Sequence, residues 1–207
     1  MERMLCFATN NAHKLEEVQA ALSGSGTPPQ QGKLFVLRTL REIGCTDELP
    51  ETTGTIPGNS RQKARYVFDH FNVACFADDT GLEVEALDGE PGVDSAYYAG
   101  EPRDNARNRA LLLKNLQGQS NRRAQFRSVF TLVEPGPNGE PIEHQFEGIV
   151  TGVIIDVERG DGGFGYDPLF VPDGYEQTFA EMPLAEKNKI SHRARALAKL
   201  VAYLGQA

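Results

Sequence analysis

Apolar residues follow two patterns along this chain: short continuous or alternating runs, and longer stretches in which they recur every three or four positions. Runs of the first kind predict β-strands, and the second spacing predicts helices with one buried face. The predicted strands cover residues 3–9, 34–37, 73–77, 82–87, 125–133, 142–155 and 169–171. The predicted helices are one capped by Asn10 or Asn11, two at residues 60–71 and 104–116, and one at residues 191–204 that is capped by Ser191. Strands and helices in this order predict the α/β class, with a mixed central sheet flanked by helices.

Glycine- and proline-rich segments separate these elements. Residues 24–32 read as a loop, and residues 50–59 as a turn-rich, irregular segment. The turn PGPNGEP separates the two long predicted strands, 125–133 and 142–155, which favours an antiparallel hairpin. We therefore expect one domain over residues 1–207, with two lobes around a cleft.

The composition narrows the functional classes. The 207 residues carry a net charge of −8, which argues against a broad basic surface for nucleic acid and against an anionic membrane surface. The first apolar run spans only residues 4–8, too short for a signal-peptide core or a membrane span. Cys6, Cys45 and Cys75 lack the spacing of a zinc site, so we expect packed, reduced thiols. These features predict a cytoplasmic protein that binds neither nucleic acid nor a membrane.

The segment TNNAHK, residues 9–14, lies where the first predicted strand gives way to a helix. Free backbone N–H groups and the positive end of the helix dipole make such a junction a phosphate site, and Lys14 adds a full charge about one turn in. On this segment alone, an ordinary capped helix with a solvated lysine is the simpler interpretation.

Two adjacent carboxylates, Asp78 and Asp79, follow a predicted strand in the segment FADDTGLEVEAL. Like charges this close need a cation, a hydrogen-bond network or a shared proton. Oxygen ligands of this kind suit Mg²⁺, which binds through one or two carboxylates plus substrate phosphates; Glu51 and Asp94 are further candidates. The alternative is a turn at the end of the strand, which Asp, Thr and Gly all favour.

The glycine-rich segment GDGGFGYD, residues 160–167, contains the G-x-G-x-x-G spacing of dinucleotide-binding proteins. That fingerprint requires a helix at the glycines, and the residues that follow, Pro168 and Pro172 among them, exclude one. We expect instead a loop that presents Phe164 and Tyr166 for stacking on a base. A plain hairpin loop is the competing interpretation.

The segment KNKISHR gathers Lys187, Lys189, His192 and Arg193 just before or within the first turn of the last predicted helix. Cations at a helix N-terminus oppose the helix dipole, which indicates that something anionic binds there. A solvated basic face is the alternative.

Taken in order and spacing, these four segments resemble the Ham1 or inosine triphosphate pyrophosphatase family. TNNAHK resembles the family's T-x-N-x-x-K, FADDTGLEV its A-D-D-S/T-G-L strand, GGFGYDPLF its G-F-G-Y-D-P-x-F loop, and EKNKISHR its E-K-x-x-x-S-H-R. The resemblance covers nearly the whole chain and implies an elongated α/β fold, with a nucleotide-binding cleft between two lobes, in a homodimer. It also implies hydrolysis of non-canonical purine nucleoside triphosphates (dITP, ITP and XTP) to monophosphate and pyrophosphate, with Mg²⁺ as the cofactor.

The family pattern implies a role for each matching residue. Asp79 would be the proton acceptor and a Mg²⁺ ligand, and Glu51 a further carboxylate of the metal site. Adjacent carboxylates are not separable by sequence, so Asp78 stays open as the ligand with Asp79 as the base alone. His192 and Arg193, both hydrogen-bond donors, would face the base. The full set implied in substrate binding is Thr9, Asn10, Asn11, Ala12, His13, Lys14, Thr80, Phe164, Gly165, Tyr166, Asp167, Lys187, His192 and Arg193.

Two positions depart from the family pattern. Gly58 stands where the family often has Glu, which leaves the site one carboxylate poorer, and Tyr97 stands where the common S-A-R-Y has Arg.

Two other functions compete with the one that the family resemblance implies. One is a Maf-like pyrophosphatase for modified pyrimidine or methylated guanine nucleotides, against which the FGYDP and SHR segments argue. The other is a sensor that binds a triphosphate without cleaving it, against which both aspartates argue.

Overall fold

The computed structural model describes residues 3–24 and 35–205. Its strands are β1 (Arg3–Phe7), β2 (Phe35–Thr39), β3 (Cys75–Val84), β4 (Pro91–Gly92), β5 (Arg123–Pro135), β6 (Pro141–Ile154) and β7 (Phe170–Pro172). Its helices are α1 (Ala12–Gly24), α2 (Ile56–Phe71), α3 (Asn105–Asn115), α4 (Leu184–Ile190) and α5 (His192–Leu204), with short 3₁₀ helices η1 (Arg41–Ile43), η2 (Glu85–Leu87) and η3 (Asp167–Leu169). No helix in the described ranges is long and apolar enough to cross a membrane. Residues 25–32 of the first predicted loop and residue 34 of the second predicted strand lie outside the described residues.

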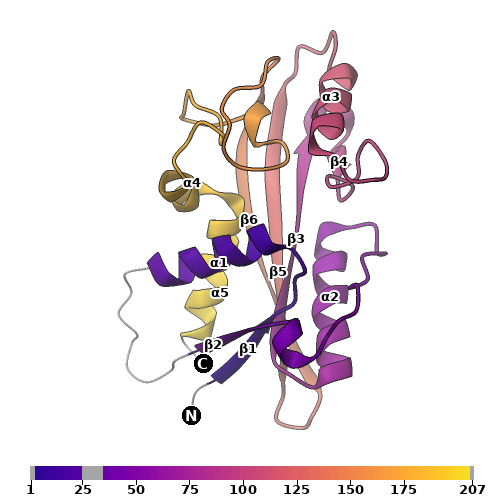
Figure 1. Ribbon diagram of the computed structural model, residues 1–207, viewed down its shortest axis with the longest axis vertical. Coiled ribbons are helices and arrows are strands. Elements are labelled where there is room, and N and C mark those ends of the chain that lie inside the picture. The colour runs from indigo at the N-terminus through magenta and orange to yellow at the C-terminus, as the bar shows by residue number, and fades with distance from the viewer. Residues whose placement is uncertain (1–2, 25–34, 206–207) are drawn as a thin grey trace. The chain divides into compact units, whose positions relative to one another are not determined.

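The strands form one mixed sheet in the order β2-β1-β3-β5-β6-β7, with β4 paired to β3 (Figure 1). β1 runs parallel to β2 and to β3, whereas β4 and β7 pair antiparallel with β3 and β6. β5 and β6 are neighbours joined by a tight turn, in which the Gly136 N–H donates to the Glu140 carbonyl at 2.9 Å. The predicted mixed sheet and its long hairpin are both confirmed.

The chain divides into two compact units. Unit 1 comprises Met1–Asp79, Val129–Glu147 and Ala196–Ala207, and unit 2 comprises Thr80–Ser128 and Gly148–Arg195. Strands β3, β5 and β6 contribute residues to both units. Two compact units agree with the two lobes expected from the sequence.

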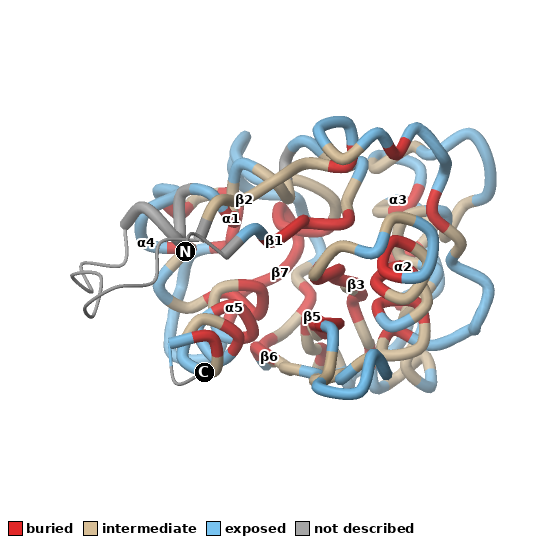
Figure 2. Tube along the Cα trace, turned by 90° about the horizontal axis from the view of Figure 1, so that it is seen from below, coloured by how far each residue is buried: buried red, intermediate tan, exposed pale blue. Residues whose placement is uncertain are grey.

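In unit 1 both faces of the sheet are covered, which explains why its strands are almost continuously apolar. Helix α1 and the last turns of α5 lie over one face, and α2 lies over the other (Figure 1). Successive β3 residues alternate between these faces. Phe76 stacks on Phe7 with ring centroids 4.7 Å apart, in the core that includes α1 and α5. Cys75 and Ala77 pack instead with Ala64 of α2, and Figure 2 shows the buried side of that helix turned toward the strands.

Unit 2 has its own apolar core. Leu112 of α3 is fully buried there, together with an aromatic cluster built from β5, β7 and the segment that follows β7. Phe170 lies 4.8 Å from Phe126 and 5.2 Å from Phe179, measured between ring centroids. Two of these rings contact the cationic segment: Phe179 lies against Lys187, and Phe126 stacks on His192.

Helix α2 begins four residues earlier than predicted, at Ile56. The Thr55 side chain caps it by accepting the Gly58 N–H at 3.1 Å. Pro57 then lies in the first turn, where the missing N–H of proline has no intrahelical partner to lose. The prediction that residues 50–59 are irregular is therefore wrong for their last four residues, because these form the first turn of α2.

Helix α4 was not predicted, and it separates Lys187 from the last helix. Its residues are mostly polar, and Lys187 is the buried one among them, so the segment lacks an apolar period. Helix α5 follows directly, and the Ser191 hydroxyl accepts the Ala194 N–H at 3.1 Å, which confirms Ser191 as the predicted cap. The cationic segment thus spans two helices.

The three cysteines are free and buried, as predicted. Burial raises the pKa of the Cys6 thiol to about 12 and also raises the pKa of Cys75. Thiols held in the protonated form are poor nucleophiles. The cysteines therefore serve the apolar core of unit 1.

Candidate active site

Asp78 and Asp79 lie inside β3 and not at its end. The strand is continuous from Cys75 to Val84, so the two strands predicted on either side of the aspartates are one. Leu82 pairs with Gly92 of β4, which keeps the backbone extended past Gly81. Successive side chains of a strand point to opposite faces of the sheet. The two carboxylates therefore point away from each other, and each meets its own lysine.

Asp78 pairs with Lys14 on the face that α1 covers, with Lys14 Nζ 3.0 Å from Asp78 Oδ2. TNNAHK links β1 to α1, as predicted, although β1 ends at Phe7, two residues before Thr9. The Asn11 side chain caps α1 by accepting the Lys14 N–H at 3.3 Å, and the Thr9 hydroxyl accepts the Asn11 N–H at 3.2 Å. Asn10 and Ala12 are exposed, and the side chain of His13 lies outside the described part of the structure. This junction brings backbone N–H groups, a helix N-terminus and one lysine together, which is the chemistry of an anion site.

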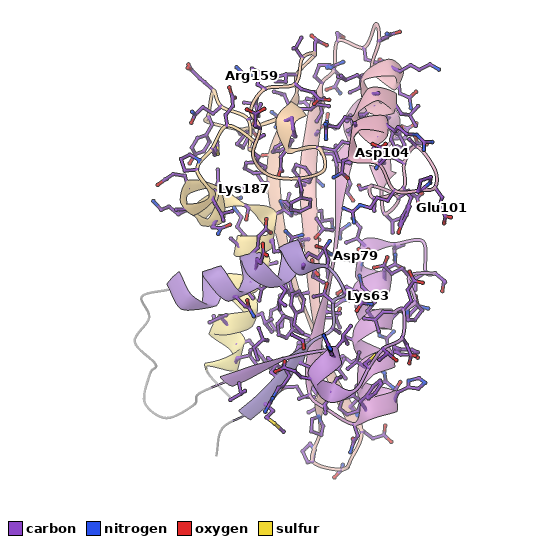
Figure 3. The ribbon with its side chains drawn as sticks, viewed as in Figure 1. Lys63, Asp79, Glu101, Asp104, Arg159 and Lys187 are labelled. Atoms are coloured by element: carbon purple, nitrogen blue, oxygen red, sulfur yellow. The ribbon has the colours of Figure 1, made fainter. Side chains whose placement is uncertain are left out.

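Asp79 faces α2, where Lys63 lies between it and Glu51. Lys63 Nζ is 3.7 Å from Asp79 Oδ1 and forms an ion pair with Glu51, and Figure 3 shows Lys63 and Asp79 side by side. Burial raises the pKa of Asp79, and the charges of Lys63 and Lys14 oppose this only in part. Burial alone would lower the pKa of Lys63, but Asp79, Asp78 and Glu51 together raise it. A buried carboxylate with a raised pKa is a better proton acceptor than an exposed one.

One oxygen of this cluster has no hydrogen-bond partner. Asp79 Oδ2 is buried, and no described side chain or backbone group bonds to it. The described residues contain no group of three or more His, Cys, Asp or Glu side chains arranged to hold a metal. Mg²⁺ usually takes one or two carboxylates and completes its shell with water and substrate phosphates, so a buried carboxylate oxygen without a partner fits that ion.

Sequence reasoning missed Lys63. A signal was present, because Lys63 precedes Val67 by four positions and so falls on the apolar face of α2. A lysine is almost never fully buried unless it is paired. The position of Lys63 on that face was thus an unused signal that buried carboxylates lie opposite it, although the pattern does not identify those carboxylates.

The loop that carries Glu51 is tied to the start of α2. Asn59 accepts the Thr53 N–H at 3.0 Å and the Thr53 hydroxyl at 2.9 Å. The hydroxyls of Thr53 and Thr55 occupy the space where a side chain at Gly58 would begin, and a Cβ there would overlap both. The departure from the family's Glu at this position thus has a structural reason in this chain.

Replacing Gly58 with Ala is expected to lower thermal stability. Alanine normally improves a helix relative to glycine, by about 1 kcal/mol. Here its methyl group overlaps the side chains of Thr53 and Thr55, and overpacking costs about 1–3 kcal/mol. Thermal unfolding followed by circular dichroism measures the balance. The double variant Thr53→Gly, Gly58→Ala should recover stability relative to Thr53→Gly alone, and a Gly58→Ala protein that melts above the parent would contradict the overlap.

The other predicted carboxylate and Thr80 lie in unit 2. Asp94 is exposed on a turn after β4. The Thr80 hydroxyl lies 2.8 Å from the Ser128 hydroxyl on the neighbouring strand. This bond links β3 and β5 directly after Asp79.

A buried ion pair forms the centre of the second cluster, in unit 2. Lys187 Nζ lies 2.8 Å from Asp167 Oδ2, and both side chains are at least 95% buried, with exposures of 5% and 3%. The same carboxylate accepts the Phe164 N–H at 2.7 Å. Gly163, with φ near +71°, brings the backbone so close to Asp167 that a side chain at this position would collide with it. The two residues predicted in separate segments, Asp167 and Lys187, are therefore one structural pair.

Cations surround the ring of Phe164. Lys187 Nζ lies 5.0 Å and the Arg193 guanidinium carbon 5.5 Å from its centroid. The ring of His192 stacks on Phe126 with centroids 4.8 Å apart and planes 14° apart. No helix opens at the glycines, because η3 and β7 follow them, so the rejection of a dinucleotide fingerprint is confirmed. Unit 2 thus gathers an aromatic ring, a histidine and two cations in one place.

Tyr166 does not share the partly exposed position of Phe164. Its side chain is 3% exposed, and its hydroxyl donates to the Ser95 carbonyl at 3.0 Å. Burial raises the pKa of Tyr166. The prediction of two presented rings is therefore wrong for Tyr166, because its ring fills the core of unit 2 and leaves Phe164 as the ring near the surface.

The pattern of these segments matches a known family over almost the entire chain. The model of the Ham1 family matches residues 5–203. The chain belongs to the Ham1 family. The resemblance that the four motifs indicate is thereby confirmed.

Relatives and solved structures agree with membership of the Ham1 family. The chain is 46% identical over 205 residues to the dITP/XTP pyrophosphatase of Porphyromonas gingivalis, covering 99% of this chain and 98% of that protein. It is 45% identical over 197 residues to the dITP/XTP pyrophosphatase of Flavobacterium johnsoniae, covering 95% of each. The solved HAM1 protein from Coxiella burnetii matches with a TM-score of 0.87 at 32% identity, over 99% of this chain and 100% of that one. The mixed sheet flanked by helices is the fold of these Ham1 proteins.

Proposed function

We propose that this protein is a nucleoside-triphosphate pyrophosphatase that hydrolyses dITP, ITP and XTP to the monophosphate and pyrophosphate. The observation that carries the proposal is Asp79, a buried carboxylate with one unbonded oxygen beside Lys63, in a Ham1 family chain. Relatives above 40% identity that carry the name dITP/XTP pyrophosphatase support the substrate class. We propose that the enzyme acts in the cytoplasm as a homodimer and removes these nucleotides from the pool.

Asp79 and Glu51 would hold Mg²⁺, because both carboxylates lie around Lys63 on the face of α2. When bound, Mg²⁺ neutralises charge on the phosphate oxygens and polarises phosphorus for attack. Asp78 is the weaker candidate for a ligand, since it points to the other face and already pairs with Lys14.

Asp79 accepts a proton from the attacking water. The water oxygen forms a new bond to the phosphorus that carries the nucleoside, and the bond to pyrophosphate breaks. Lys63 keeps the Asp79 carboxylate in place, at 3.7 Å from its Oδ1. Lys14 and the N-terminus of α1 bind the charged phosphates. In this scheme the residues of unit 1 do the chemistry on phosphorus.

The unit 2 cluster recognises the base. Inosine and xanthosine carry an oxygen at purine position 6, where adenosine carries an amino group. His192 and Arg193 donate hydrogen bonds, so the purine 6-oxygen accepts from them, whereas the adenine amino group is itself a donor and is left mismatched. A site of this kind discriminates by about 10⁴-fold in favourable cases. Phe164, with Lys187 and Arg193 against its ring, supplies the aromatic surface beside which the base lies.

Product analysis tests the proposed function. The purified protein is incubated with Mg²⁺ and, separately, with dITP, XTP, dGTP and dATP, and the products are separated by chromatography. Monophosphate and pyrophosphate from dITP and XTP are expected, with little from dATP and none after a chelator removes the metal. Guanine also carries the 6-oxygen, so turnover of dGTP measures discrimination at purine position 2. Diphosphate plus phosphate would mean that a different bond is cleaved.

Two outcomes favour other functions. Turnover confined to modified pyrimidine or methylated guanine nucleotides would favour a Maf-like activity. Tight binding of dITP without hydrolysis in Mg²⁺ would favour a sensor.

A further inference from the structure

One side chain of α3 holds both ends of the glycine-rich loop that carries Phe164. Arg109 Nη1 donates to the Gly165 carbonyl at 2.9 Å, and Arg109 Nε lies 2.8 Å from Glu158 Oε1. The Arg109 side chain is 16% exposed and that of Glu158 is 43% exposed. All three residues belong to unit 2. Arg109 therefore ties residue 158 to residue 165 across the loop.

The loop needs such a tie because of its composition. Residues 160, 162, 163 and 165 are all glycine, and glycine loses more conformational freedom on ordering than any other residue. Local bonds order parts of it: the Gly162 N–H donates to the Ala180 carbonyl at 3.1 Å, and the Phe164 N–H donates to Asp167. The bond to the Gly165 carbonyl comes from a helix 56 positions away in sequence, so it orders the loop relative to the core of unit 2.

Arginine suits this task better than lysine. A guanidinium holds several nitrogens in one fixed plane, whereas an ammonium group is a point charge on a flexible stem. Here Nη1 donates to a backbone carbonyl, while Nε lies at ion-pair distance from the Glu158 carboxylate without forming a hydrogen bond to it. The residue next to that carbonyl is Phe164, whose ring Lys187 and Arg193 approach. A displaced Gly165 would therefore displace the ring.

We propose that Arg109 is a positioning residue that orders the loop at residues 158–165, fixes Phe164 against its cations, and thereby sharpens discrimination between purine bases. The part about discrimination rests on the proposed function, whereas the ordering of the loop does not. A misplacement of about 1 Å in a binding group can cost about 10²-fold in rate, so a residue that touches no substrate still affects selectivity.

The variants are Arg109→Ala, Arg109→Lys, Glu158→Ala and a matched control, Arg107→Ala. Arg107 lies on the same helix and also donates to a backbone carbonyl, that of Ala99 at 2.9 Å, which is outside the loop. Glu158 is exposed, so its replacement breaks the tie from the surface without opening the core. If Arg109→Ala folds poorly, Glu158→Ala still tests whether the contact between Arg109 and Glu158 orders the loop.

Loop order is measured first, by hydrogen exchange over residues 158–167 and by tryptic cleavage after Arg159. Loss of a charged hydrogen bond predicts exchange and cleavage about tenfold faster in Arg109→Ala. Glu158→Ala and Arg109→Lys should be intermediate, and Arg107→Ala should match the parent. Unchanged protection in Arg109→Ala would overturn the proposal whatever the enzyme does.

Selectivity is measured second, as the ratio of kcat/KM for dITP to that for dATP. Arg109→Ala should lower this ratio by about 10–100-fold, mainly through KM for dITP, and Arg109→Lys should restore part of it. A loosened loop with an unchanged ratio would overturn the link to base selection. Should the parent protein hydrolyse neither nucleotide, the proposed function fails. In that case the dissociation constants of dITP and dATP are measured for Asp79→Asn with and without Arg109→Ala. A change in their ratio then decides whether Arg109 affects selection between the two bases.

Discussion

The Asp79→Asn protein is expected to fold normally and to lose turnover of dITP by about 10²–10⁴-fold or more. The amide has the shape of the carboxylate but accepts no proton, and it is a poorer ligand for a hard cation. The fold should survive, because burial already disfavours the charge of Asp79, as its raised pKa indicates. Pyrophosphate release measures turnover, and thermal unfolding measures the fold.

Asp78→Asn is the matched comparison for this prediction. It lies one residue earlier on the same strand but faces Lys14 on the opposite side of the sheet. Its replacement should lower stability, since Lys14 loses its partner, and should reduce turnover less than Asp79→Asn does. Near-normal turnover in Asp79→Asn would overturn the assignment of the base, and a larger loss in Asp78→Asn would exchange the two roles.

The Lys187→Met protein is expected to show the largest loss of stability. Lys187 and Asp167 form a buried pair, and removing one partner leaves an uncompensated charge, which typically costs about 3–5 kcal/mol. For a chain of this length that loss lowers the melting temperature by roughly 10 °C. Because Asp167 also accepts the Phe164 N–H, the aromatic loop should loosen as well. Thermal unfolding and hydrogen exchange of the loop measure the two effects.

Lys189→Met provides the control on the same helix. Lys189 pairs with Glu186 at 2.6 Å but is 66% exposed, so its loss should change stability by less than about 1 kcal/mol. Combining Lys187→Met with Asp167→Asn should recover part of the stability, because the amide keeps an acceptor for the Phe164 N–H and removes the unpaired charge. A Lys187→Met protein that melts with the parent would show that the pair contributes no net stability.

The sequence by itself determined the local features of this protein. Apolar periodicity predicts the hairpin of β5 and β6 and the helices α1, α3 and α5, because a strand and a helix repeat at different intervals. The caps Asn11 and Ser191 are predicted correctly because a cap bonds backbone groups within three residues of itself. The four motifs likewise carry the Ham1 family, because each is a contiguous run of residues.

Only the tertiary structure decided which residues meet. It joined two predicted strands into β3, and so placed Asp78 and Asp79 on opposite faces with different lysines. It buried Tyr166 and brought Arg109 to the loop of Phe164. The physical reason is common to these cases. Periodicity and caps depend on neighbours in the sequence, whereas the partner of a buried charge or a loop carbonyl depends on chain segments that only folding brings together.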